Sequence, residues 1–246
     1  MQINSLSMAK IRSYSLSALI LLFMISVYSC LNSVSGEGEL TYATRNTGSF
    51  TSIQLDLDAS VYITDSLETS FMISAQENLM NVIETKLKDD KLIIYSDKYI
   101  HNSKPVTIYI SASRLTEISL NGSGSIISEN TLKAGNITLE MSGSGMMKIA
   151  VVCDKLNASV SGSGKMEISG SSHEADIEIS GSGIIDASRH ATGNCNADIS
   201  GSCKALVFSS GILKASVSGS GNILYRGAPA EVIPSVSGSG SIEKME

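Results

Sequence analysis

Apolar and polar residues alternate on both sides of a Gly-Ser-Gly triplet that recurs through the second half of the chain. The spacing between copies is 18 to 21 residues, which is too regular for a flexible Ser/Gly linker. The triplets begin at Gly122, Gly143, Gly162, Gly181, Gly201, Gly219 and Gly238, and the copy at Gly201 ends in Cys203 instead of glycine.

The residues that flank each triplet are apolar at fixed positions. The residues that stand two positions before each triplet are Leu120, Met141, Val160, Ile179, Ile199, Val217 and Val236. The residues that stand two positions after each triplet are Ile126, Met147, Met166, Ile185, Ala205, Ile223 and Ile242. Alternation with a period of two predicts a strand on each side of a corner.

A repeat of this kind predicts an all-β fold, a single-chain parallel β-helix (β-solenoid), with coils of about 19 residues. Each coil has a strand, a Gly-Ser-Gly corner, a second strand and a looser return of about six residues. Stacking the coils about 4.8 Å apart would bury the apolar ladders, which one coil cannot bury alone.

Glycine suits the corner because it adopts positive φ without strain and lets stacked backbones approach closely. The corner glycines predicted to have this structural role are Gly122, Gly124, Gly143, Gly145, Gly162, Gly164, Gly181, Gly183, Gly219, Gly221, Gly238 and Gly240.

The chain divides into a leader, a tether and one solenoid domain. Residues 117–246 hold the regular repeats, and residues 45–116 are expected to form irregular coils of the same solenoid. Strands are predicted at Ser52–Ile63, Lys91–Tyr95 and Val106–Ile110. Asn78–Leu87 fits a strand or a short helix, and a separate small β-sandwich is the alternative for this half.

The N-terminal 29 residues are typical of a lipoprotein signal peptide. Lys10 and Arg12 precede an apolar run at Leu16–Val27, which is too short to span a bilayer comfortably. The following Val27-Tyr28-Ser29-Cys30 resembles a bacterial lipobox, so we expect Cys30 to be lipidated. Residues 30–44 would then be a tether, and the protein would be an outer-membrane lipoprotein of the cell envelope. Cleavage elsewhere, with Cys30 incidental, is the alternative.

Charge argues against nucleic acid as a partner. The full chain has a net charge of −6, and removal of residues 1–29 leaves 16 basic and 24 acidic residues. Nucleic-acid binding needs a basic patch. The predicted partners are therefore the membrane, through the lipid anchor, and an unknown protein or glycan.

Few residues are arranged for catalysis or metal binding, so we predict no catalytic residues, no cofactor and no metal site. His101, His173 and His190 lack partners at metal-ligand spacing and are expected in surface loops. Glu178 and Asp198 share the third position before a triplet, so they should lie on adjacent coils facing solvent. They are a weak candidate for Ca²⁺ binding.

The cysteines and aromatic residues add little chemistry. Cys195 is expected in the core and Cys153 in a loose return, and a bond between Cys195 and Cys203 is a disfavoured alternative to free thiols. Glycans often bind on aromatic faces, for which Tyr95, Tyr99 and Tyr109 are the candidates.

Two long segments, Leu115–Ile126 (LTEISLNGSGSI) and Ser218–Ile242, resemble the bacterial family described as Putative auto-transporter adhesin, head GIN domain. The resemblance covers roughly residues 45–242 and implies a β-helix with no catalytic or binding residues to transfer. Departures are Cys203 at a corner and Pro234 at an inward position, where strand pairing is expected to weaken or end.

Together these observations favour a non-catalytic envelope lipoprotein that acts as an adhesin or as a binding or structural module. The alternative is an enzyme, a lyase or glycosidase that acts on polysaccharide, because β-helices host such enzymes and they need clustered acidic groups.

Overall fold

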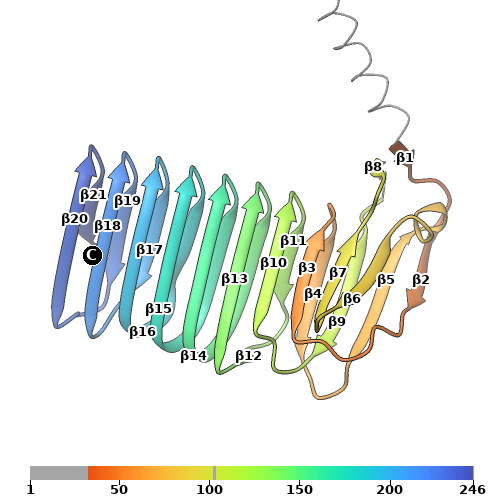
Figure 1. Cartoon of the computed structure of the whole chain (residues 1–246), viewed down its shortest axis with the longest axis horizontal. Helices are drawn as coiled ribbons and strands as arrows, with labels where there is room; N and C mark the ends of the chain where they lie inside the picture. Colours follow the sequence, from red (N-terminus) through yellow and green to blue (C-terminus); the bar gives the residue numbers. More distant parts are fainter. Residues whose placement is uncertain (1–32, 102–103, 246) are drawn as a thin grey trace, which may run out of the picture.

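The computed structural model describes residues 33–101 and 104–245, and it confirms the predicted β-solenoid. Figure 1 shows the coils in a row, with the C-terminal coils at one end and an irregular group of strands at the other. Within these residues, no helix is long and apolar enough to cross a membrane. The predicted signal peptide and Cys30 lie outside the described residues.

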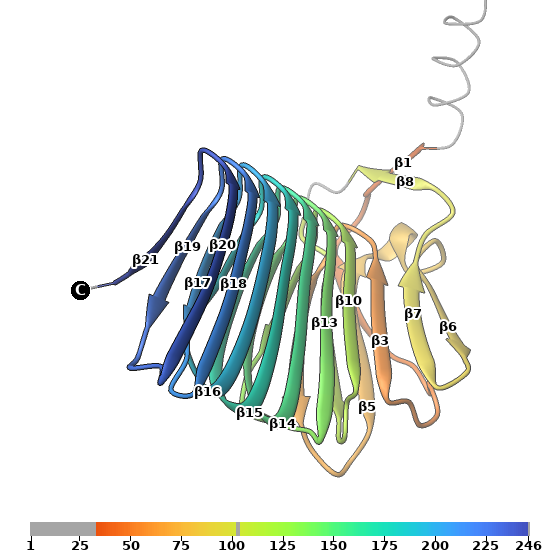
Figure 2. The same ribbon diagram turned by 60° about the vertical axis from the view of Figure 1, so that its left-hand side comes forward.

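Each regular coil has an inbound arm, which leads into the corner, and an outbound arm, which leaves it. Successive inbound arms pair in parallel, and so do successive outbound arms (Figure 2). The strands are β10 (Glu117–Gly122), β11 (Ser125–Ser128), β12 (Leu132–Lys133), β13 (Asn136–Gly143), β14 (Met146–Gly162), β15 (Lys165–Gly181), β16 (Ile184–Gly201), β17 (Lys204–Phe208), β18 (Ile212–Gly219), β19 (Asn222–Arg226), β20 (Glu231–Gly238) and β21 (Ser241–Lys244).

The register follows the sequence repeat. Val160 lies beside Ile179, and Ile179 lies beside Ile199 in the next coil. The apolar positions that flank the triplets are buried in the first six coils, and they become more exposed only in the last coil. The core is therefore a set of apolar ladders between the inbound and outbound arms.

The return segments are more ordered than the sequence predicts. β14, β15 and β16 run unbroken through the return for 17, 17 and 18 residues. Val151 and Cys153 lie inward there and pair in register with Gly170 and Ser172, so the backbone keeps its ladder. The expectation of a loose return, with Cys153 in it, is wrong for these coils.

One extra residue distinguishes the coil that ends at Gly201. The register of β15 with β16 shifts between Glu167 and Ser169, where Arg189 comes to lie opposite Ser169. Asp186 Oδ1 accepts hydrogen bonds from the backbone N–H (3.0 Å) and the hydroxyl (2.6 Å) of Ser188 at this bulge. The bulge absorbs the longer spacing without disturbing the next corner.

The N-terminal strands continue the same ladders, but in a different spatial order. They are β3 (Ser52–Asp56), β4 (Ser60–Asp65), β5 (Ser70–Gln76), β6 (Glu84–Lys88), β7 (Lys91–Tyr95), β8 (Tyr99–His101) and β9 (Thr107–Ala112). β3 lies between β10 and β7, and β4 lies between β11 and β9, all in parallel. These ladders run into the regular repeats without a break, unlike the alternative of a separate sandwich.

Antiparallel strands close this end of the solenoid. β5 pairs with β9, and β6 pairs with β7. Of Asn78–Leu87, the first residues belong to a 3₁₀ helix, η1 (Glu77–Leu79), and the last to β6. Phe71 and Leu79 are fully buried and cover the end of the core.

The expected tether is partly folded. Within residues 30–44, β1 (Ser33–Ser35) pairs with β8, and β2 (Leu40–Thr44) pairs with β5. The prediction of a tether is therefore wrong for β1 and β2. Both pair with the edges of distant strands, and the sequence pattern does not indicate these pairings.

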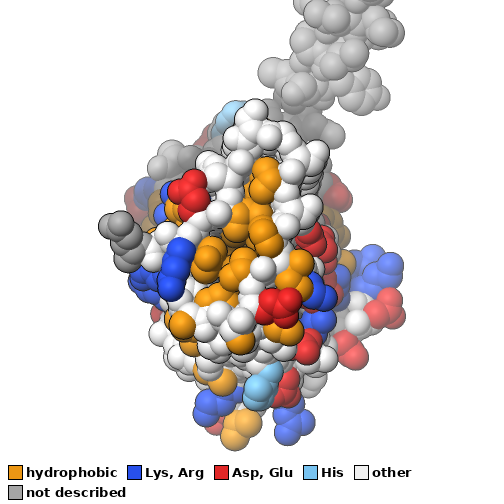
Figure 3. Space-filling model, turned by 90° about the vertical axis from the view of Figure 1, so that its left-hand side faces the viewer, with side chains coloured by type: hydrophobic (Ala, Val, Ile, Leu, Met, Phe, Trp, Pro, Cys, Tyr) orange, Lys and Arg blue, Asp and Glu red, His pale blue; other side chains and the backbone are white. Residues whose placement is uncertain are grey.

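The C-terminal end is open. Figure 3 views this end and shows hydrophobic side chains gathered at its centre. Contrary to expectation, β20 pairs with β18 through Pro234 to the corner. Donors to the preceding coil lie on outward-facing residues, as in Thr138 N–H to Thr116 O (2.9 Å). An inward residue such as Pro234 directs its nitrogen to the open end, so no bond to β18 is lost.

Candidate functional site

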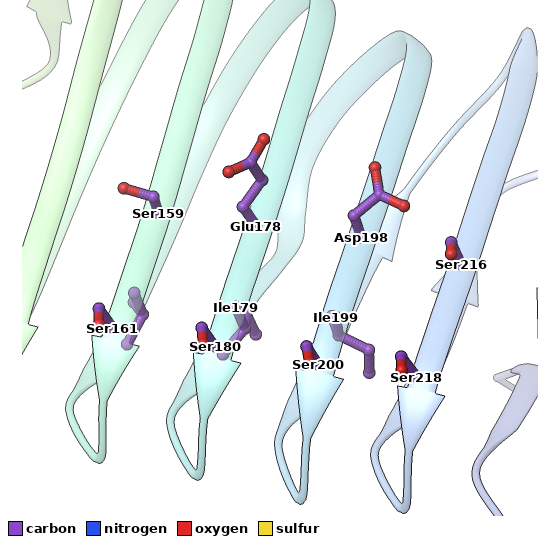
Figure 4. Close-up of a pocket in the computed structure, with 11 residues that line it drawn as sticks. Ser159, Ser161, Glu178, Ile179, Ser180, Asp198, Ile199, Ser200, Ser216 and Ser218 are labelled. Carbon is purple, nitrogen blue, oxygen red and sulfur yellow. The ribbon is translucent and has the colours of Figure 1, made fainter. Parts of the chain in front are cut away.

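The outer surface of the inbound arms carries a regular array of hydroxyl and carboxylate groups, which we call the serine–acid face. Glu178 and Asp198 are direct neighbours in register on β15 and β16 and project outward from adjacent strands (Figure 4). Ser159 and Ser216 occupy the same position on the coils to either side. A second row, two residues closer to the corner, consists of serines on all four coils. The face comprises Ser159, Ser161, Glu178, Ser180, Asp198, Ser200, Ser216 and Ser218, which line a shallow depression of about 400 Å³.

The face is acidic at its centre. Asp198 Oδ2 accepts a hydrogen bond from Asn196 Nδ2 (3.2 Å), which holds this carboxylate toward solvent. A neighbouring lysine is already engaged, because Lys155 Nζ lies 2.7 Å from Asp176 Oδ2. This contact raises the pKa of Lys155. The face therefore offers acceptors and hydroxyls to a partner.

The weak candidates for Ca²⁺ binding, Glu178 and Asp198, lie side by side on neighbouring strands. Among the described residues, no group of three or more His, Cys, Asp or Glu side chains is arranged to hold a metal ion. Two carboxylates alone do not supply the six to eight oxygen ligands that Ca²⁺ takes.

The histidines divide between the surface and the interior. His173 is exposed, with Nδ1 3.4 Å from Asp154 Oδ1, and His101 is also exposed. His101 lies in β8 and His173 in β15, so both are at the surface as expected but neither is in a loop. His190 lies in β16 and is 1% exposed, so the expectation of a surface loop is wrong for it in both respects. The bulge before it shifts the alternation by one residue and turns its side chain inward, opposite Gly170.

His190 belongs to a buried polar cluster in the return of β15 and β16. Its Nε2 lies 3.0 Å from Ser172 Oγ, which in turn lies 3.1 Å from Thr192 Oγ1. Burial lowers the pKa of His190, and the backbone of Ser169 partly counteracts this effect. His190 and Thr192 are buried, whereas Ser172 is half-buried, so the imidazole ring is withdrawn from solvent.

All three cysteines of the described chain are buried and free, so the Cys195–Cys203 bond is not formed. Burial raises the pKa of Cys153 to about 11 and that of Cys195 to about 12. Cys195 lies in the core, as predicted. Thiols of this kind are poor nucleophiles at neutral pH because the thiolate is scarce.

The three candidate tyrosines do not form one group. Tyr109 stacks on Tyr62 with ring centroids 5.4 Å apart, which occupies one face of its ring. The Tyr95 hydroxyl donates to Glu84 Oε2 (2.7 Å) on β6. Tyr99, on β8, is 68% exposed and lines a second depression, which we call the Tyr99 cleft.

The Tyr99 cleft lies at the corners of the N-terminal coils and has a volume of about 380 Å³. Its walls come from Asp56–Asp58, Ser96–Ile100 and Asn121–Ser123. Of its lining, the sequence pattern indicated only Tyr99, as an aromatic candidate, and did not predict the cleft. The available signal was the unusually long interval between the strands that begin at Lys91 and Thr107, where a regular coil would have a short corner.

The corner glycines occupy the positions that the repeat predicts. The first glycine of each corner has φ between +110° and +123°. At Gly162, an added Cβ would lie 2.6 Å from the Gly143 carbonyl oxygen of the preceding coil. Cys203 replaces the second glycine of its corner, where φ is not positive and a side chain is tolerated.

Comparison with solved structures supports the architecture. The chain is similar to the putative adhesin of Bacteroides fragilis NCTC 9343, with 27% identity over 86% of this chain and 100% of that chain, and a TM-score of 0.83. It also shares its fold with a putative adhesin of Parabacteroides merdae ATCC 43184, with 24% identity over 87% of this chain and 100% of that one, and a TM-score of 0.72.

A third similar structure is described as a putative lipid binding protein of Parabacteroides distasonis ATCC 8503, with 24% identity over 87% and 100% of the two chains and a TM-score of 0.72. No curated protein matches the chain. A family model matches residues 49–229, which are most of the chain. By this match and by its fold, the chain belongs to the family described as Putative auto-transporter adhesin, head GIN domain.

Proposed function

We propose that this protein is a non-catalytic adhesin of the cell envelope that binds its partner through the serine–acid face. The observation that carries the proposal is the array of outward hydroxyls and carboxylates, in register over four coils, which no other strand among residues 33–101 and 104–245 covers. Its backbone is fixed by two neighbouring strands at every coil, so the array is preorganised for binding. Membership of an adhesin family supports this function.

Anchoring through Cys30 completes the proposal. A lipidated Cys30 would attach the N-terminal end of the solenoid to the outer membrane, since diacylation gives stable anchoring. β1 and β2 follow only a few residues later, so the anchor would connect almost directly to the folded domain. The row of coils would then begin at the membrane.

Adhesion can be tested with beads that carry the purified protein. We expect the beads to bind bacterial envelope polysaccharide or host mucin coated on a surface. Replacing Glu178 and Asp198 by Gln and Asn should reduce bead retention at least several-fold, because the central acceptors lose their charge. The control replaces Glu231 and Glu243, both exposed on the last coil, by Gln.

Equal retention of both variants would contradict a role for the serine–acid face. Release of reducing or unsaturated ends from the polysaccharide by the wild type, with loss of this release in the Glu178/Asp198 variant, would instead favour the polysaccharide lyase or glycosidase.

A further inference from the structure

The N-terminal coils depart from the regular corner, and this departure creates the Tyr99 cleft. Leu120 of β10 pairs with Leu55 of β3, so Leu57-Asp58-Ala59 occupies the place of Gly122-Ser123-Gly124. In the outermost coil, residues 96–101, which include β8, lie where a regular coil has its corner. This longer segment lines one side of the cleft, and the corners of the next two coils line the rest of it.

The lining of the Tyr99 cleft includes a fixed hydrogen-bond acceptor, Asp56. The carboxylate of Asp56 receives one hydrogen bond from Gln54 Nε2 and another from Asn121 Nδ2, each 2.7 Å long. Both donors come from the sheet, one from β3 itself and one from β10. Asp56 is thus oriented before any ligand arrives, while its remaining lone pairs can accept further hydrogen bonds.

The wall presents an aromatic ring. Ser96 Oγ accepts a hydrogen bond from Lys98 N–H (3.1 Å) and donates one to Lys98 O (2.8 Å), which fixes the turn before Tyr99. On the other side, β1 pairs with β8 and places Ser33 beside Tyr99. The His101 ring meets the Tyr99 ring edge-on, with an interplanar angle of 73°, and the tyrosine remains 68% exposed.

The combination of an exposed ring, a fixed carboxylate and an amide selects a class of ligand. A sugar has an apolar C–H face that packs on an aromatic ring and hydroxyls that donate to carboxylate oxygens. Asp56, Asp58 and Asp97 outnumber Lys98 in the lining, which disfavours an anionic ligand. The volume of about 380 Å³ suits one or two sugar units.

We infer that the Tyr99 cleft binds a neutral saccharide, with Tyr99 as the stacking ring and with Asp56 and Asn121 as the polar contacts. This site is separate from the serine–acid face and shares no lining residue with it. Asn121 occupies the same position before its corner as Ser161, but two coils closer to the N-terminal end. One ligand-binding site therefore lies at the closed end of the solenoid, where the loops depart from the repeat, as is common for binding sites on rigid scaffolds.

The test uses saturation-transfer NMR and titration with methyl glycosides of glucose, galactose, mannose and N-acetylglucosamine, with methyl glucuronide as the anionic comparison. We expect at least one neutral glycoside to bind and the glucuronide to bind more weakly. Tyr99→Ala should weaken binding about tenfold, which corresponds to about 1.4 kcal/mol. Tyr99→Phe should retain binding, since it keeps the ring. Asp56→Asn should weaken it several-fold.

Tyr42→Ala is the matched control, because Tyr42 is also 68% exposed but lies on β2, outside the cleft. Circular dichroism of each variant checks the fold. Absence of binding by every neutral glycoside would overturn the inference, as would equal affinity of the wild type and Tyr99→Ala. Since the adhesion test changes Glu178 and Asp198 instead, failure of one proposal is distinguishable from failure of the other.

Discussion

At the scale of single residues, stacking of coils imposes demands that depend on position within the repeat. The first glycine of each corner adopts positive φ, and from Gly143 onward it must also leave room for the glycine carbonyl of the preceding corner. The serine that follows is under neither constraint. It bonds to the preceding coil through its backbone, as in the hydrogen bond from Ser163 N–H to Gly143 O (2.9 Å), so its side chain is not needed for this contact. Two residues with similar repetition in the sequence thus differ in their importance for stability.

Gly162→Val should therefore destabilise the protein strongly. Backbone strain at positive φ costs about 1–3 kcal/mol, and the clash with Gly143 O adds to it. Ser163→Ala is the control and should change the free energy of unfolding by less than about 0.5 kcal/mol. Chemical denaturation measures both. Equal stability of Gly162→Val and the wild type would show that the corner can change its conformation at no energetic expense.

His190 should make stability depend on pH. Its pKa in the folded protein lies below the unfolded value of about 6.5, so the unfolded chain binds a proton first as the pH falls. Stability from the neutral ring is complete above about pH 6.5 and decreases as the pH falls below that value. Thermal melting between pH 7.5 and 5 should show a smaller decrease for His190→Gln than for the wild type. Parallel curves would contradict this role.

At the scale of the strand, one position in the register decides between core and surface. Ile179 is 2% exposed and stacks between Val160 and Ile199, whereas its neighbour Glu178 faces solvent. Because the side-chain period of a strand is two, a shift of one residue would exchange these environments. β14 and β15 keep one register through the arms and the return. β15 and β16 shift by one residue at the bulge and then keep their register as far as the corner at Gly201.

Ile179→Asp should destabilise the protein by more than the roughly 2–5 kcal/mol that truncation to alanine costs in a core, because it buries an unpaired charge. The double variant Glu178→Ala/Asp198→Ala should leave stability unchanged or raise it slightly, since it removes two like charges on neighbouring strands. Denaturant titration distinguishes the two. A large loss in the double variant would mean that the acids have a structural partner.

At the scale of the whole molecule, the two ends differ. Antiparallel strands and η1 close the N-terminal end, while the C-terminal coil leaves apolar residues such as Ile233 and Val236 about half exposed. The Tyr99 cleft lies toward the closed end and is braced by β1. The proposed anchor at Cys30 immediately precedes this strand, so attachment and the cleft share one end of the rod.

Cell fractionation tests the anchor. The wild type should sediment with membranes and be extracted by detergent, while Cys30→Ser should lose the lipid and leave the membrane fraction, since the rest of the N-terminal segment is removed or too short to span. Cys153→Ser is the control, because that thiol is buried in β14. Membrane association of Cys30→Ser at the wild-type level, with no change in mass, would contradict lipidation.

Local pattern alone determined the regular half of this protein. A corner every 18 to 21 residues with apolar residues at fixed offsets specifies the coil, and stacking of equal coils then specifies the register and the placing of Glu178 beside Asp198. The sequence did not determine the order of β3, β7 and β10, the pairing of β1 with β8, the inward turn of His190 or the Tyr99 cleft. Each of these depends on which distant edges meet, or on a one-residue bulge that reverses the alternation. Such pairings are decided by the free energy of the assembled sheet, to which segments far apart in the chain contribute together.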